Sequence, residues 1–128
     1  MKTLMKAAGT GTSGAVVFVI AVWFVADAAS GPILADNPDG DLAEVRLAGA
    51  IIATIIGGIL GTGLAFLLRG RARGERRFLN ICGALLIVYG AWAFSQAEDL
   101  VTGIWLNVMH LAAAAPIIDQ LRRWLRTT

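Results

Sequence analysis

The apolar residues of this chain fall into four long blocks, at residues 8–29, 45–68, 78–97 and 101–121. Each block is close to the ~20 residues that a helix needs to cross ~30 Å of hydrocarbon. Backbone N–H and C=O groups find no water inside a bilayer, so each block has to be helical. The blocks also lack the alternation of apolar and polar positions that barrel strands show. The pattern predicts an all-α integral membrane four-helix bundle, a single domain over residues 1–128.

Two alternatives accompany this prediction. A soluble fold would have to enclose four helices that are apolar on every side, and 128 residues give too little volume for that. The second alternative concerns the first block, because Lys2, Lys6 and the Ala26-Asp27-Ala28 triplet resemble a secretory signal peptide with its cleavage site. Cleavage there would leave three spans. We expect a retained span, because the small residues at 9–14 suit contact with a neighbouring helix.

Charged residues between the blocks alternate in sign from one gap to the next. Cations precede the first block, fill the second gap and follow the fourth block: Lys2, Lys6, Arg69, Arg71, Arg73, Arg76, Arg77, Arg122, Arg123 and Arg126. Beyond Pro116, Asp119 can pair with Arg122 or Arg123. Acids dominate the other two gaps: Asp36, Asp39, Asp41 and Glu44 in the first, Glu98 and Asp99 in the third.

This charge pattern predicts the orientation of the protein. Short loops rich in Lys and Arg are retained in the cytoplasm, so we expect both termini there and a multi-pass protein of the bacterial inner (plasma) membrane. The basic residues sit at membrane borders, where they meet anionic lipid headgroups of the bilayer. The formal net charge of +2 therefore does not indicate a nucleic-acid partner.

The first acidic gap contains the run Asp36-Asn37-Pro38-Asp39-Gly40-Asp41. Asn-Pro-Asp-Gly favours a tight turn, since Pro presets φ and Gly ends the turn. A calcium loop is the alternative, but Ala35 stands at its first ligand position and Arg46 at its closing Glu position. We therefore expect a solvated turn.

Three glycines of the second block, Gly57, Gly58 and Gly61, include a Gly-xxx-Gly pair. Such a pair lets another helix approach closely, and it serves packing either within one chain or between two copies. The pattern does not distinguish these two cases.

Polar side chains inside the spans mark candidate sites, because each is costly in a bilayer unless it finds a partner. His110 lies about 15 Å from either end of its block, near the bilayer midplane. A tight turn at Glu98 makes the third and fourth helices an antiparallel hairpin. This hairpin sets Tyr89 level with His110 and Trp92 level with Asn107, while the same depth count places Gly57 near Tyr89. Tyr89, Trp92, Asn107 and His110 form our candidate ligand or proton site.

The alternative for His110 is a structural role, as a neutral side chain that bonds to Tyr, Asn or a backbone carbonyl across a helix interface. Haem or zinc would need more ligands than the one His and one Cys of the chain supply, so no cofactor is expected. No catalytic grouping occurs in the sequence, and we expect no enzyme. Small multidrug transporters have a similar length and plan, but their mid-membrane Glu in the first helix has no counterpart here beyond Asp27 at the outer end.

The segment IWLNVMHLAAAAP at residues 104–116 resembles the last helix of an uncharacterised family of short four-helix membrane proteins, mostly from actinobacteria. This family is classed as domain of unknown function 6069. AFSQ at residues 93–96 and the basic gap after the second block are also similar to it. The resemblance implies a topology and no activity, and it draws attention to Asn107 and His110.

These observations favour a small membrane protein that self-associates or serves as an accessory subunit of a larger membrane complex. The supporting features are small-residue faces, short loops and the lack of catalytic groups. The alternative is a ligand-binding bundle, or a small-molecule or proton-coupled transporter, that uses the midplane His/Tyr/Asn cluster.

Overall fold

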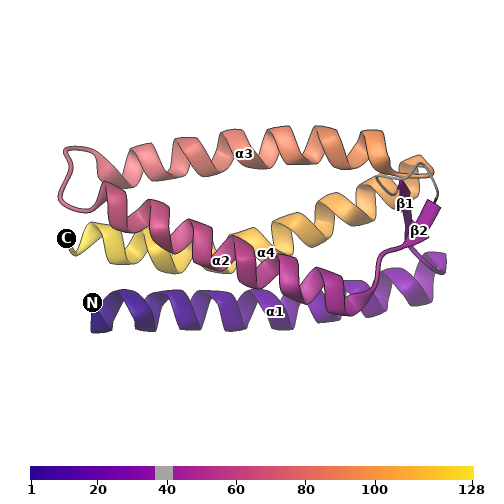
Figure 1. Ribbon diagram of the computed structural model, residues 1–128, viewed down its shortest axis with the longest axis horizontal. Helices are drawn as coiled ribbons and strands as arrows, with labels where there is room; N and C mark the ends of the chain where they lie inside the picture. Colours follow the sequence, from indigo (N-terminus) through magenta and orange to yellow (C-terminus); the bar gives the residue numbers. More distant parts are fainter. Residues whose placement is uncertain (37–41) are drawn as a thin grey trace.

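The computed structural model describes residues 1–36 and 42–128 (Figure 1). The described part contains four helices: α1 (Lys2–Ser30), α2 (Leu47–Leu68), α3 (Gly74–Gln96) and α4 (Leu100–Arg126). Each of them is long and apolar enough to cross a membrane. The prediction of a four-helix membrane-spanning bundle is therefore confirmed.

Three helices extend beyond the apolar blocks that predicted them. α1 begins at Lys2 instead of residue 8, α3 begins at Gly74 instead of residue 78, and α4 continues to Arg126 instead of residue 121. Hydropathy locates the part of a helix that suits hydrocarbon, whereas backbone hydrogen bonding continues into the charged flanks. The basic gap predicted over residues 69–77 is accordingly shorter, since Arg76 and Arg77 lie in the first turn of α3.

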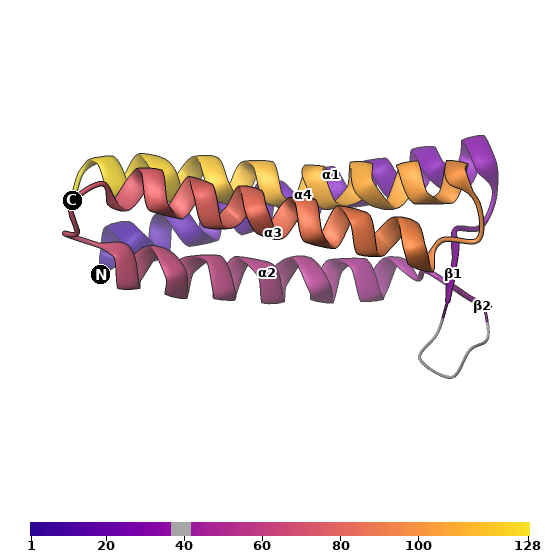
Figure 2. The ribbon, with the colours of Figure 1, turned by 90° about the horizontal axis from the view of Figure 1, so that it is seen from above.

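A short hairpin follows α1, which the sequence did not predict. Strand β1 (Leu34–Asp36) pairs antiparallel with β2 (Leu42–Glu44), with Leu34 opposite Glu44. The predicted turn and the calcium alternative at residues 37–41 lie outside the described residues. The pairing continues one step beyond the strands, where Val45 N donates to Ile33 O at 2.7 Å. A bond from Glu98 N to Leu34 O at 3.5 Å attaches the hairpin to the α3–α4 turn. The loop after α1 thus meets the α3–α4 turn at one end of the bundle (Figure 2).

α1 and α4 make the most extensive helix contact of the described chain. The buried residues of α1 repeat along one face: Leu4, Gly11, Ala15, Val19 and Ala26. At Gly11 an added Cβ atom would lie 3.0 Å from Ile117 Cα and 3.1 Å from the Pro116 carbonyl oxygen. Two backbones therefore approach each other as closely as a glycine allows, which maximises van der Waals contact between the helices.

The described residues form two clusters of buried side chains, one toward each end of the bundle. The larger one, the basic-end core, consists of Leu4, Ala15, Ala65, Leu68, Phe78, Ile117, Leu121, Trp124 and Leu125. The smaller one, the acidic-end core, consists of Ala26, Ile33, Ala93, Leu106 and Met109. All four helices contribute to the basic-end core, whereas α2 contributes no residue to the acidic-end core.

Two indole groups connect loops and helices at the acidic end. Trp23 Nε1 donates to the Val45 carbonyl at 2.9 Å, and Trp105 Nε1 donates to Ser30 Oγ at 2.9 Å. The α3–α4 turn is held by Asp99, whose side chain accepts the backbone N–H of Thr102 at 2.7 Å as the N-cap of α4. This hydrogen bond favours the ionised carboxylate and holds the pKa of Asp99 below its ordinary value.

Figures 1 and 2 place both chain termini and the α2–α3 connection at the same end of the bundle. The ten cations named above belong to these three segments and to the flanks of the helices beside them. β1, β2 and the α3–α4 turn, with Glu44, Glu98 and Asp99, lie at the opposite end. The charge alternation of the sequence is therefore a separation of charge between the two ends of the molecule.

The closeness of α1 and α4 leads to a stability prediction. Gly11→Ala forces a methyl group against the α4 backbone, which cannot move aside as a side chain can. We therefore expect the free energy of unfolding to fall by about 1–3 kcal/mol. Gly9→Ala is the matched control, because no other helix lies within 4 Å of a Cβ atom at Gly9. Thermal unfolding in detergent should show a lower midpoint for Gly11→Ala only. Equal midpoints for the two variants would contradict the close approach.

Candidate functional site

Tyr89 and Trp92 lie on the exposed side of α3. Their side chains are 51% and 57% exposed, and their rings meet edge to face with centroids 6.4 Å apart. We expected these two residues to lie level with His110 and Asn107 of α4, close enough for hydrogen bonds across the helix interface. Among the described residues, no bond joins Tyr89 to His110 or Trp92 to Asn107.

Asn107 instead connects α4 to the backbone of α3. Its Nδ2 group donates to the Gly103 carbonyl at 2.9 Å and to the Gly90 carbonyl at 3.3 Å. A Cβ atom at Gly90 would lie 2.5 Å from Asn107 Oδ1, so only glycine leaves room for the amide. Asn107 thus joins two helices through an interhelical hydrogen bond, which is a structural task.

His110 is exposed, and its Nδ1 atom lies 2.8 Å from the Leu106 carbonyl oxygen of its own helix. A carbonyl oxygen only accepts hydrogen bonds, so the neutral tautomer that fits this contact carries its proton on Nδ1. Nε2 is then an acceptor, and no described residue donates to it. His110 therefore presents one unused lone pair on the surface of the bundle.

Gly57, Tyr89 and His110 have equivalent places on their three helices. Each stands eleven residues from a member of the basic-end core on the same helix: Leu68 for Gly57, Phe78 for Tyr89 and Leu121 for His110. Eleven residues make three helical turns, a rise of about 16 Å, so each residue shares a helix face with its core counterpart. The common depth of the three residues stays a prediction.

These shared faces are covered at the basic end and uncovered three helical turns farther along. Phe78 and Leu121 are fully buried, whereas Tyr89 and His110 are exposed. No other helix lies within 4 Å of a Cβ atom at Gly57. Figure 1 shows the reason, because α2 and α3 start side by side at their connection and separate along their length. We call Gly57, Tyr89 and His110 the mid-membrane face.

The two other glycines of α2 pack inside the bundle. A Cβ atom at Gly58 would overlap the Thr12 side chain of α1, and one at Gly61 would lie 3.4 Å from Leu121 Cδ1 of α4. These contacts are made within one chain. Gly57 differs from them, since it is exposed and meets no other helix of its own chain.

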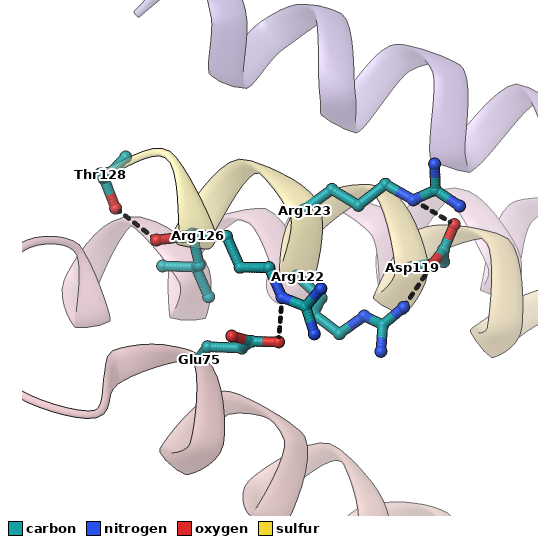
Figure 3. A network of polar contacts seen from close by, with 7 residues as sticks. Glu75, Asp119, Arg122, Arg123, Arg126 and Thr128 are labelled. Atoms are coloured by element: carbon teal, nitrogen blue, oxygen red, sulfur yellow. Dashed lines mark hydrogen bonds and ion pairs between the residues drawn. The ribbon is translucent and has the colours of Figure 1, made fainter.

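Ion pairs gather at the basic end (Figure 3). Asp119 accepts from Arg122 Nη2 and from Arg123 Nε, both at 2.9 Å, so the predicted pairing of Asp119 is confirmed with both partners. Arg126 Nε lies 2.6 Å from Glu75 Oε1 and joins α4 to α3. The sequence did not predict this last pair. Its only signal there is the opposite charge of two residues near helix ends that both belong to the basic end.

Two hollows occur on the described surface. One has a volume of about 290 Å³ and lies between α3 and α4, and the other, of about 180 Å³, lies beside the α2–α3 connection. Neither is lined by a residue of the mid-membrane face. The described residues contain no group of three or more His, Cys, Asp or Glu side chains that would hold a metal ion.

Fold and surface together define a multi-pass membrane protein of four helices. The sequence model of a protein family, described as a family of unknown function (DUF6069), matches residues 1–127. The chain belongs to that family. The resemblance inferred from the fourth helix is therefore confirmed over nearly the whole chain. Comparisons with curated proteins and with solved structures found no match.

The separate roles of Asn107 and His110 can be tested by stability. Asn107→Leu removes the hydrogen bond to the Gly90 carbonyl. We expect the free energy of unfolding to fall by about 1 kcal/mol, the usual contribution of an interhelical hydrogen bond in a membrane. His110→Ala removes a bond within one helix and should lower the unfolding midpoint of the single chain less. An equal or larger loss in His110→Ala would show that His110 also holds the chain together.

Proposed function

We propose that this chain is a self-associating membrane subunit, in which the mid-membrane face of one copy covers that of a second copy. One observation supports the proposal above the others: His110, halfway along its span, presents an unused acceptor on an uncovered helix face. Polar side chains at this depth are costly against lipid and normally face protein or water. A second copy would replace lipid with a hydrogen-bonding partner.

The mid-membrane face is complementary to itself. Tyr89 carries a hydroxyl donor and His110 an imidazole acceptor. Each stands about 16 Å along its helix from a residue of the basic-end core, Tyr89 from Phe78 and His110 from Leu121. In a two-fold dimer of parallel copies, the Tyr89 of each copy meets the His110 of the other, because the interface uses the same surface twice. Gly57 offers no side chain at this level and permits close approach of the partner.

A small ligand is the second candidate occupant. The observation in its favour is the same lone pair on His110 Nε2, which would accept a hydrogen bond from a ligand hydroxyl, amine or amide. Ligand sites are concave and bury most of their ligand. Tyr89 and His110 are both exposed instead of enclosed, which favours a protein partner over a small molecule. The proposal gives the chain a structural role and no catalytic step.

Self-association can be measured by energy transfer between labelled copies in bilayers, over a series of protein-to-lipid ratios. His110→Ala and Tyr89→Phe each remove the two symmetric bonds, so each should weaken dimers roughly tenfold. The double variant should dimerise with the same affinity as either single variant, because both changes break the same two hydrogen bonds. Gly57→Ile should prevent close approach of the second copy. Gly63→Ile serves as the control, because Gly63 lies on another face of α2 and, like Gly57, meets no other helix within 4 Å of an added Cβ atom.

Native mass spectrometry of the same proteins separates the two candidates. A two-copy mass that is lost in Gly57→Ile and kept in Gly63→Ile supports self-association. A monomer that carries an added small mass, absent in His110→Ala, would reject the dimer and support the ligand site.

We also propose that the basic end faces the cytoplasm of a bacterial inner membrane. The support is the gathering of ten of the eleven Lys and Arg residues at this end, where Glu75 and Asp119 are the only acids among the described residues.

Orientation can be checked by labelling single cysteines in a Cys82→Ala background. A membrane-impermeant maleimide added to intact cells should label Glu98→Cys, which lies in the α3–α4 turn. Thr128→Cys, at the basic end, should react only after the membrane is permeabilised. Labelling of Thr128→Cys in intact cells would reverse the proposed orientation.

A further inference from the structure

A groove of about 290 Å³ runs along the seam between α3 and α4. Leu79 and Leu86 of α3 and Leu111, Ala115 and Ile118 of α4 form its apolar walls. Asp119 and Arg122 line its end toward the C-terminus of α4. The groove therefore has an apolar body and a charged end.

The length and the direction of the groove match one leaflet of a bilayer. Leu111 and Arg122 are eleven residues apart on α4, a helical rise of about 16 Å. Half of a ~30 Å hydrocarbon core is about 15 Å deep. Leu111 adjoins His110 in mid-membrane, so the apolar body begins near the midplane and the charged end reaches the border of the bilayer.

The charged end has an unused donor. Arg122 Nη2 donates to Asp119 Oδ1 at 2.9 Å, but the buried Nε–H group of Arg122 has no hydrogen-bond partner among the described residues. Asp119 also accepts from Arg123, so two guanidinium groups share one carboxylate and leave one positive charge in excess (Figure 3). A buried donor without a partner costs free energy until an acceptor reaches it.

We propose that this groove binds an anionic phospholipid of the basic-side leaflet. One acyl chain lies along the apolar body, and a phosphate oxygen of the headgroup accepts from Arg122 Nε. Guanidinium groups bind phosphate oxygens through charge-assisted hydrogen bonds, which satisfies the buried donor and the excess charge together. A free phosphate ion would leave the apolar walls unused, so the combination selects a lipid.

The test measures binding of phosphatidylglycerol and phosphatidylcholine with matched acyl chains to the detergent-purified full chain, by native mass spectrometry. We expect the anionic lipid to bind more tightly. Arg122→Gln should weaken its binding about tenfold, as expected for a lost charge-assisted bond. Arg76→Gln is the charge-matched control, since Arg76 lies at the same end and does not line the groove.

The apolar part of the groove is tested separately. Ala115→Phe places a ring in the groove and should weaken both lipids, whereas Ala84→Phe on the exposed side of α3 should not. The proposal requires each variant to differ from its control. If Arg122→Gln behaves like Arg76→Gln, or Ala115→Phe like Ala84→Phe, the lipid is held by general surface attraction and the groove is no binding site. Unfolding midpoints of all four variants, measured in parallel, identify any loss caused by misfolding.

Discussion

The contact of Gly11 with the α4 backbone at Pro116 and Ile117 sets the distance between α1 and α4, and the other helices are placed around this pair. Lipid tails are as apolar as leucine, so burial from water does not drive helices together inside a bilayer. Close fit has to supply the attraction instead. Small residues at the contact allow two helices to approach over much of their length, which accounts for the pairing of the first and last helices of the chain.

α2 joins this pair through two further glycines, Gly58 against Thr12 of α1 and Gly61 against Leu121 of α4. Both contacts lie in the half of α2 that leads to the basic end. α3 follows through Phe78, which is fully buried in the basic-end core. All four helices are thus held at one end, where ion pairs such as Arg126 with Glu75 add a polar connection.

Away from the basic end, α2 contributes no residue to the acidic-end core, while α1, α3 and α4 still pack together there. α2 and α3 therefore separate beyond Leu68 and Phe78 (Figure 1), and Tyr89 and His110 are exposed. Asn107, in contrast, has a partner within the bundle, because it donates to the Gly90 carbonyl across the contact between α3 and α4. The same seam widens near the basic end into the groove that Arg122 lines. The surfaces that we propose for a second copy and for a lipid therefore both follow from how the helices pack in this bundle.

The sequence alone determined the four spans and the sign of the charge at each end. It could do so because both follow from local properties, namely the hydropathy of ~20-residue segments and the positions of Lys and Arg beside them. The expectation of equal depth for Gly57, Tyr89 and His110 also comes from the sequence, through helical rise and short turns, and it stays a prediction.

Only the tertiary structure decided which polar residues meet. Depth counting places Tyr89 and His110 at one level, but it does not show how each helix is rotated or how far apart the helices lie. Rotation and distance depend on small-residue contacts such as Gly11 with Ile117 and Gly90 with Asn107, which join residues far apart in the chain. Asn107 consequently bonds to a backbone carbonyl and His110 remains uncovered, because packing between helices is a property of pairs of surfaces and not of any one segment.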